Sequence, residues 1–491
     1  MIGTVAGASL RLWRREMAVL FRTSERRVSH LLAVGALTAL LFGVILALTS
    51  TSQLDKSLPV ELRTTLVTTS LGGALLTSSL VATIVFVSAP PGTALQTLLD
   101  LLPVSRTAAQ VGQHLPLAGC AFLFSLSLSA VSLVVGLRIS PSPMWSVVFT
   151  AAVLLVVVCA CLTAFAGLGA LRALFARCLR MSDQYAMSLA GILVVAITVG
   201  TVVPDVFRFE PDEGTRGAGI LFIHRALAAL LADPSAWDLY LIVFAWLLVT
   251  AAGVRSLAWS AARRSPAPPM RIFIGVAVPF HPFRGPLWAF LLASIRSPQG
   301  VMTVLGASSL VMTAWLVARE PLLAPLAPTI AASAATIPFL LVIFAIGRAL
   351  PLRWWGTQLT GRRSWWITPI VVGHFLLGWA VALPILGLEI VLQLIEPDDV
   401  VEVIAKLVFA FVAALVAGSV VPYSEQQPLS ATLSGCVVAL LFTGNAVASA
   451  LTMSSLGLSA PLIVPAVGAL LLIGAIIPLV GVLAKHDGTI T

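Results

Sequence analysis

The sequence predicts an all-α integral membrane protein with twelve transmembrane helices, arranged as two parallel six-helix repeats with short cytoplasmic coupling helices. Of its 491 residues, 59% are hydrophobic and only 10% are charged, whereas soluble domains carry roughly 25% charged residues. The apolar runs are about 20 residues long, which is the length that a helix needs to cross the hydrocarbon core; barrel strands need only about ten.

Six apolar segments in each half of the chain are expected to cross the membrane. They lie near residues 29–50, 69–90, 112–136, 144–168, 185–204 and 236–257, and then near 299–318, 328–350, 369–394, 400–421, 431–452 and 461–484. An even number of spans places both termini on the same side. If that side is the cytoplasm, 21 Lys and Arg residues lie inside and 8 lie outside, as the positive-inside rule requires. We therefore expect a multi-pass protein of the cell membrane with both termini in the cytoplasm.

The net charge of +9 follows from this topology, because the basic residues are distributed over several short loops. Nucleic-acid binding would need them on one folded surface, so we expect no nucleic-acid partner. The five cysteines lie in or beside apolar runs, with no histidines at ligand spacing. We expect no metal site, no catalytic residue and no cofactor bound by this chain.

Similar segments recur in the same order in both halves, which predicts an internal repeat. A short amphipathic piece precedes each first span, "LRLWRREMAVLFR" at 10–22 and "PLWAFLLASIRS" at 286–297. A polar interruption follows each second span, "TLLDLLPVSRTAAQVGQHLP" at 97–116 and "GTQLTGRRSWWITPIVVGHF" at 356–375. The predicted parts are a first half at 1–257, a Pro/Arg-rich cytoplasmic linker at 258–285 and a second half at 286–491. The largest outer segment, 204–237, has room for one interfacial helix around 220–232.

Both polar interruptions are predicted to lie on the cytoplasmic side. The first contains a helix-compatible stretch at 93–102, then the helix stop Pro103, and then Ser105, which is expected to cap a helix that begins at Arg106 and enters the third span. A short helix on the inner membrane surface would offer its side chains to a cytoplasmic protein. We therefore interpret the interruptions as docking sites.

This segment, with "LLPVSR" at 101–106, resembles the first cytoplasmic loop of ABC type-2 exporter permeases, and the order of amphipathic helices, spans and loops resembles that family over the whole chain. The resemblance implies separate cytoplasmic ATPase subunits, two copies, that bind ATP-Mg and rock the two halves. It implies docking around 93–106 and 348–364, at Leu98, Leu99, Asp100, Leu102, Ser105, Arg106, Arg353, Gln358, Arg362 and Arg363. The chain departs from the pattern in carrying both halves. Its second loop is also richer in Arg and Trp, which equally suits membrane anchoring and an interfacial aromatic belt.

Few ionisable residues lie within the predicted spans, and each is a functional candidate there. His114 and His374 occupy comparable positions just inside the third and ninth spans; they either hydrogen-bond to neighbouring helices or bind a ligand. Glu389 is the best candidate for a buried carboxylate. Because it lies toward the outer end of its span, we expect it to reach water.

The leading hypothesis is the permease subunit of an ABC exporter that moves a hydrophobic or amphipathic substrate outward. The chain itself would not be an enzyme, since no G-x-x-x-x-G-K-[ST] phosphate loop occurs. Membrane lipid is an expected partner, and the sequence leaves open whether a second permease chain takes part. The first alternative is a secondary transporter driven by an ion gradient, which would favour a buried carboxylate relay. The second is a membrane glycosyltransferase, which would need paired acidic residues on an outer loop. The segments "EPDE" (210–213) and "EPDDV" (396–400) contain such pairs, although no large outer domain accompanies them.

Overall fold

Every regular element that the computed structural model describes is a helix. The described residues are 1–20, 24–30, 33, 37, 44, 59–88, 104–207, 222–261, 281, 283–319, 324, 327–349, 365–423, 430–456 and 460–485. Within them, nine helices are long and apolar enough to cross a membrane. This agrees with an all-α, multi-pass membrane protein. The count of twelve spans stays a prediction, and the first span, 29–50, lies largely outside the described residues.

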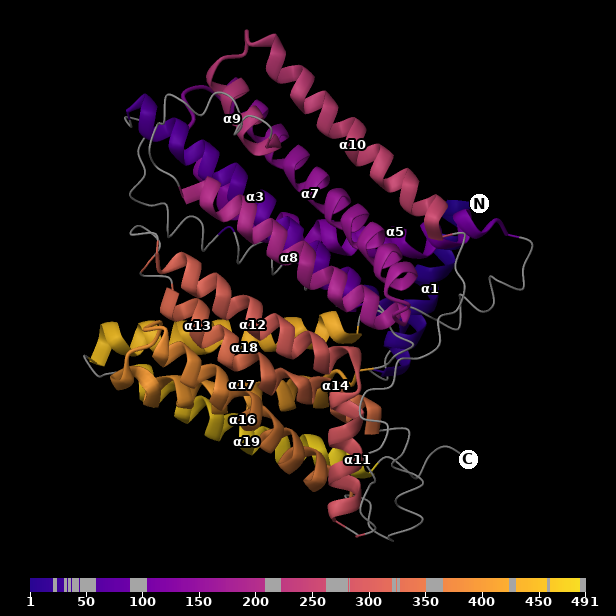
Figure 1. The fold of residues 1–491 in the computed structure, drawn as a ribbon, viewed down its shortest axis with the longest axis vertical. Coiled ribbons are helices and arrows are strands. Elements are labelled where there is room, and N and C mark those ends of the chain that lie inside the picture. Colours follow the sequence, from indigo (N-terminus) through magenta and orange to yellow (C-terminus); the bar gives the residue numbers. More distant parts are fainter. Residues whose placement is uncertain are drawn as a thin grey trace. The chain divides into compact units, whose positions relative to one another are not determined.

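The chain divides into two compact units, one at Met1–Val87 and Pro91–Pro268 and the other at Ser88–Pro90 and Pro269–Thr491. Unit 1 is coloured indigo to magenta in Figure 1, and unit 2 is coloured from magenta-red to yellow. Most of the predicted linker, 258–285, lies outside the described residues. The two six-span repeats therefore stay a prediction, and each unit is taken by itself.

Unit 1 is built around one long central helix. Its helices are α1 (Ile2–Leu20), α3 (Val60–Ser88), α5 (Arg106–Leu128), α6 (Ala130–Ile139), α7 (Pro143–Cys178), α8 (Asp183–Phe207), α9 (Ile223–Ala232) and α10 (Trp237–Ala261). Helix α7 packs against α5, α6, α8, α9 and α10, and several of these run side by side in Figure 1. Its sequence is apolar on all sides, as a helix surrounded by other helices and lipid requires.

Two features of unit 1 bear on the predictions. The helix expected around 220–232 is present as α9, although it packs against α7 and α10.

The predicted third span is divided at Ser129 into α5 and α6. Serines are frequent at this break, and the Ser127 hydroxyl donates to the carbonyl of Leu123, a back-bond that bends helices. The Ser132 hydroxyl donates to the carbonyl of Ser70, which joins α6 to α3.

Unit 2 has its own central helix, α17. Its elements are α11 (Arg284–Ile295), α12 (Pro298–Val317), α13 (Ala327–Thr336), η3 (Ile337–Leu341), α14 (Val342–Ala349), α16 (Ile367–Val391), η5 (Pro397–Asp399), α17 (Val400–Val420), α18 (Ser430–Leu456) and α19 (Ala460–Lys485). Helix α17 contacts α13, α14, α18 and α19, and its residues from Phe409 to Ser419 are all buried. The predicted eighth span is divided by the 3₁₀ turn η3, because Pro338 lacks the N–H that an α-helix needs.

Candidate coupling sites and buried polar groups

Most of the predicted docking residues lie outside the described part of the chain. Leu98, Leu99, Asp100 and Leu102 of the first loop do so, as do Arg353, Gln358, Arg362 and Arg363 of the second. The structure does describe where the first loop joins its span. Ser105 has extended backbone geometry, and its side chain accepts a hydrogen bond from the N–H of Ala108. Arg106 is the first residue of α5, so Ser105 caps this helix as predicted.

The helix that leads into unit 1, α1, packs along α5 close to this cap. Its buried side chains, Val5, Ser9, Trp13 and Met17, recur every four residues and therefore form one stripe along the helix. The two helices approach closely at Gly112 of α5. A Cβ atom added there would lie 2.6 Å from the Val5 Cβ and 3.0 Å from a backbone oxygen. Only a glycine permits this contact without movement of α1.

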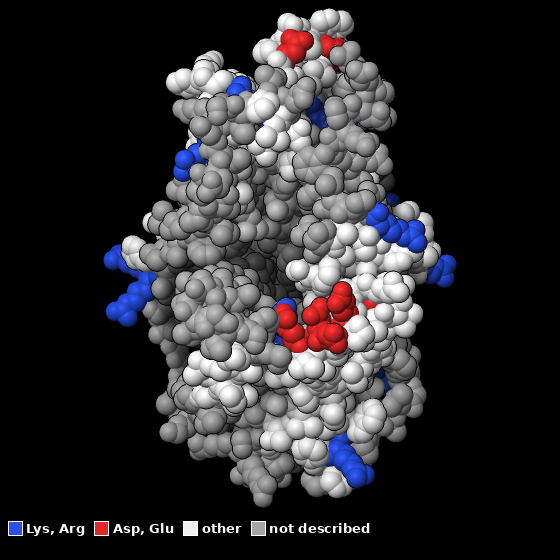
Figure 2. Space-filling model, turned by 90° about the vertical axis from the view of Figure 1, so that its left-hand side faces the viewer, with Lys and Arg blue, Asp and Glu red and all other residues white. Residues whose placement is uncertain are grey.

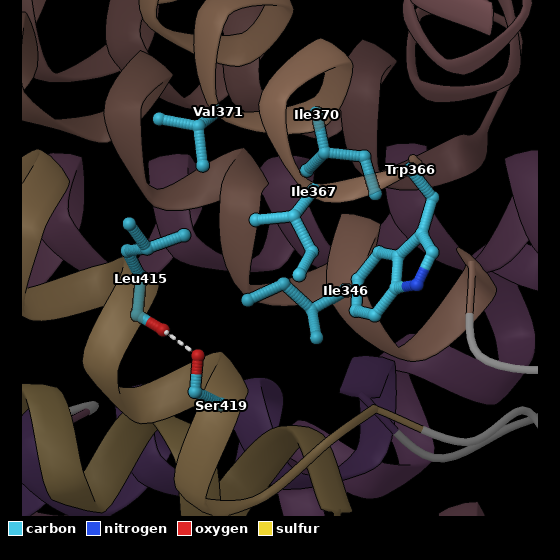
Figure 3. Close-up of a pocket in the computed structure, with 7 residues that line it drawn as sticks. All are labelled: Ile346, Trp366, Ile367, Ile370, Val371, Leu415 and Ser419. Carbon is cyan, nitrogen blue, oxygen red and sulfur yellow. Dashed lines mark hydrogen bonds between the residues drawn. The ribbon is translucent and has the colours of Figure 1, made fainter. Parts of the chain in front are cut away.

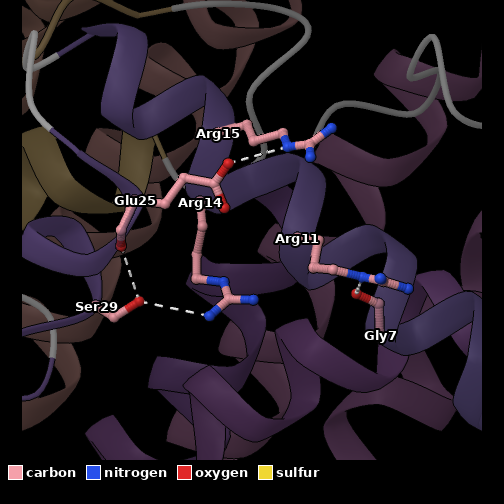
Figure 4. Close-up of polar contacts among 6 residues, drawn as sticks. All are labelled: Gly7, Arg11, Arg14, Arg15, Glu25 and Ser29. Carbon is pink, nitrogen blue, oxygen red and sulfur yellow. Dashed lines mark hydrogen bonds and ion pairs between the residues drawn. The ribbon is translucent and has the colours of Figure 1, made fainter.

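The opposite side of α1 is basic. Figure 4 shows that Arg15 forms an ion pair with Glu25 at 3.0 Å, and that Arg14 donates to the hydroxyl of Ser29 at 3.5 Å. Arg11 donates to a carbonyl of its own helix, that of Gly7. The Arg15 and Glu25 side chains are 73% and 43% exposed, so this ion pair is worth little in stability. The apolar stripe, rather than the ion pair, holds α1 in place.

The helix that leads into unit 2, α11, packs against α16 in a similar way. A Cβ atom added at Gly373 of α16 would lie 3.4 Å from Leu291, which is an ordinary van der Waals contact. One turn of α16 also hydrogen-bonds to α11. The His374 Nδ1 donates to the carbonyl of Ile370 at 2.9 Å, which leaves Nε2 of the neutral ring to accept the Ser294 hydroxyl proton at 2.7 Å. His374 therefore bonds to a neighbouring helix, one of the two roles considered from the sequence.

His114, its predicted counterpart, has different surroundings. Its ring lies beside Phe86 and Phe165, with centroid distances of 6.4 and 5.6 Å. The two histidines are thus at comparable positions in the sequence but have different contacts. Among the described residues, no three His, Cys, Asp or Glu side chains are grouped closely enough to hold a metal ion.

A polar cluster joins three segments of unit 2 at the same end as the His374–Ser294 bond. Arg348 of α14 donates to the side-chain oxygen of Gln299 in α12. The amide nitrogen of Gln299 donates to the hydroxyl of Tyr423, just after α17, at 3.3 Å. The Arg348 guanidinium lies 5.8 Å from the centre of the Tyr423 ring. Arg348 is also the first residue of the predicted docking segment 348–364. The cluster could not be recognised from the sequence, because Gln299 and Tyr423 are 124 residues apart.

A small apolar pocket lies among α14, α16 and α17 (Figure 3). It is lined by Ile346, Trp366, Ile367, Ile370, Val371, Leu415 and Ser419. The one hydroxyl in the lining, that of Ser419, donates to the carbonyl of Leu415 within its own helix. The indole Nε1 of Trp366 is the other polar side-chain atom of the lining, and it has no hydrogen-bond partner among the described residues. The rest of the lining is apolar and suits an apolar side chain.

The placement of Glu389 corrects the expectation from the sequence. It was expected to reach water, but its exposed fraction is 0%. Helix α16 ends at Val391, and the chain then folds back so that Leu394 and Ile395 are also buried. Neither carboxyl oxygen of Glu389 has a hydrogen-bond partner in the part of the chain that the structure describes. The returning turn covers a side chain that would otherwise lie at the end of a membrane helix.

A buried arginine in unit 1 is paired with a carboxylate. Arg172 of α7 donates from two nitrogens to the two carboxylate oxygens of Asp183, at 3.3 and 2.7 Å. This bidentate pair closes the turn between α7 and α8, in which Arg180 has a positive φ of 50°.

Comparisons of the chain with protein-family models, with curated proteins and with solved structures returned no match.

Proposed function

We propose that the chain is the transmembrane permease subunit of an ABC exporter in the cell membrane, with both termini in the cytoplasm. It moves a hydrophobic or amphipathic substrate outward by alternating access. The energy comes from two copies of a separate cytoplasmic ATPase that binds ATP-Mg. The ATPases dock on the loops around 93–106 and 348–364.

The observation that carries this proposal is a shared pattern of contacts in the two units. In each unit, the leading helix packs on the third predicted span, α1 on α5 and α11 on α16. The fourth span then packs on the fifth and sixth: α7 contacts α8 and α10, while α17 contacts α18 and α19. The same neighbours in the same order favour two parallel six-span repeats, as expected for a duplicated permease.

The contacts also supply a route for mechanical work in unit 2. A subunit that pushes on the loop between α14 and α16 acts on Arg348 at one end and on the first turn of α16 at the other. Arg348 is joined to α12 through Gln299, and α16 is joined to α11 through the His374–Ser294 bond. Force on the loop is therefore distributed to four helices at once. The absence of a phosphate loop from the whole sequence favours an ATPase on another chain.

Copurification tests the proposal. A tag on the C-terminus should recover a cytoplasmic ATPase with a phosphate loop, and scrambling residues 97–106 should remove it. Scrambling residues 396–400, on the predicted outer side, is the matched control and should leave recovery unchanged. Recovery of the folded chain without any nucleotide-binding protein from native membranes would contradict the proposal.

One observation favours the alternative of a secondary transporter. Glu389 is a buried carboxyl without a hydrogen-bond partner among the described residues, and buried carboxyls are typical of ion-coupled carriers. Vesicles loaded with a lipophilic fluorescent dye separate the two functions. An ABC exporter moves the dye only when ATP is supplied, whereas a secondary transporter moves it in ATP-depleted vesicles under an imposed proton gradient.

A further inference from the structure

The last turn of α16 places the Glu389 side chain in a position that normally carries an apolar residue. Gln393 has a positive φ of 56°. Its N–H bonds to the carbonyl of Ile390 at 3.0 Å, and the N–H of Leu394 bonds to the carbonyl of Glu389 at 2.9 Å. These two bonds define a Schellman cap, in which the side chains at the Leu394 and Glu389 positions usually make a hydrophobic contact. Here a carboxyl occupies one side of that contact.

Glu389 also continues the buried stripe of α16. The buried residues of the helix include Ile370, His374, Gly378, Ala382, Leu386 and Glu389, at spacings of four and then three. One face of the helix is therefore packed from end to end against α11, α12, α13, η3 and α14. Glu389 is fixed on this packed face by the cap and by the stripe, and it cannot turn to water without opening the cap.

Among the described residues, the charged groups on the surrounding elements have other contacts or belong to segments that pack near the start of α16. Helix α11, which begins at Arg284 and is followed by Arg296, places Phe290 beside Trp365 and Ser294 against His374. Arg348 of α14 bonds to Gln299, five residues after Ser294. His374 itself is 15 residues from Glu389, about 22 Å at 1.5 Å per residue. Helices α12 and α13 and the turn η3 contain no ionisable side chain.

The charged groups near the Glu389 end also have other contacts. Arg319, after α12, lies over the Trp315 ring at 3.5 Å. Lys406 forms an ion pair with Glu402 within α17. Acidic side chains gather on the face shown in Figure 2, and the exposed acids of the turn between α16 and α17 are Glu396, Asp398 and Asp399. Those carboxylates are in contact with solvent, and Glu389 is not.

A carboxylate anion in such a place is costly. Burial of a charge without a partner or a hydrogen bond costs several kcal/mol in a protein. A metal ion would neutralise the charge only with several further ligands, and the described residues contain no group of three His, Cys, Asp or Glu side chains that could hold one. A proton removes the charge and needs neither further ligands nor a cavity.

We propose that Glu389 is a proton-binding site in unit 2. The carboxyl holds a proton while the cap of α16 covers it, and it gives that proton to water when this end of the helix opens. Opening would therefore be linked to proton release, and an acidic outer medium would favour the covered state. The inference depends on the fold of unit 2 and not on the ATP-driven function proposed above.

Infrared spectroscopy of the purified chain in lipid vesicles at pH 7 tests this directly. The wild-type protein should show the carbonyl stretch of a protonated carboxylic acid, and Glu389→Gln should lose intensity equivalent to one carboxyl. Glu396→Gln, which removes an exposed carboxyl seven residues along the chain, should leave the band unchanged. Identical bands in the wild type and in Glu389→Gln would overturn the proposal.

A second variant guards against loss of folding. If Glu389→Gln cannot be purified, Glu389→Asp keeps a carboxyl and should shift the frequency of the same band. An unshifted band in that variant would also count against the proposal. Because the spectra are recorded without ATP or a partner chain, failure of the copurification experiment would leave this result unaffected.

Discussion

The contact between α1 and α5 at Gly112 predicts that alanine destabilises the protein at position 112 but not at Gly373, the comparable glycine of α16. In Gly112→Ala, the new methyl group would lie 2.6 Å from the Val5 Cβ, about 1 Å closer than carbon atoms normally approach. Neither Val5 Cβ nor the nearby backbone oxygen can move without the helix, so α1 must retreat. Overpacking of this kind costs about 1–3 kcal/mol, and the better helix propensity of alanine returns about 0.5–1 kcal/mol. The central values of these two ranges give a net loss of about 1 kcal/mol.

Gly373→Ala provides the matched control in unit 2. The new methyl group would lie 3.4 Å from Leu291, at the flexible end of a side chain. We therefore expect no clash and a gain of about 0.5–1 kcal/mol from helix propensity. Thermal unfolding in detergent, followed by the loss of the circular dichroism of the helices, measures both variants. If Gly112→Ala melts at or above the wild-type temperature, the packing argument for α1 is wrong.

Three further outcomes follow from the geometry. Gly347→Ala places a methyl group against the backbone of the segment after α17, which cannot yield as a side chain can, so we expect more than about 3 kcal/mol of destabilisation or loss of the folded protein in a size-exclusion profile. Removal of either partner of the Arg172–Asp183 pair should lower the free energy of unfolding by about 1–3 kcal/mol. A double-mutant cycle should show coupling between the two side chains, and additive losses of stability would contradict the pairing. In the turn before α10, hydrogen bonds from the side chain and the backbone of Ser235 lower the pKa of Asp233. The Asp233 carboxylate and the turn that it stabilises should therefore persist below the usual titration range of Asp, and they should be lost as the pH falls through the lowered pKa. Ser235→Ala should raise this pKa in ¹³C-carboxyl NMR, and an unchanged pKa would refute the assignment.

Long apolar runs made the helical class and most helix positions predictable. The predicted spans near 144–168, 185–204 and 400–421 correspond to α7, α8 and α17. The cap at Ser105 was also correct, because the capping residue and the proline before it are local signals. The leading helix of unit 1 was predicted only from residue 10, but it begins at Ile2. The reason is that Val5 and Ser9 continue its four-residue buried stripe.

The polar contacts could not be predicted, because they depend on residues that are distant in sequence. Gln299 and Tyr423 carry no local signal of their contact with each other. Glu389 was misplaced for a different reason. The apolar sequence continues past the end of α16, and the helix ends because Gln393 adopts a left-handed conformation that glycine usually provides. Without a glycine at that position, the turn that buries Glu389 was not visible in the sequence.

We propose that a separate ATPase drives this chain from the cytoplasmic side. Photo-crosslinking in intact cells tests it most directly, with a photoreactive amino acid at position 99 in the first loop, at position 358 in the second loop, and at position 235 in the predicted outer segment as the control. Positions 99 and 358 should crosslink to one ATPase chain that contains a phosphate loop, and position 235 should not. Crosslinks from positions 99 and 358 only to lipid or to proteins without nucleotide-binding motifs would contradict it.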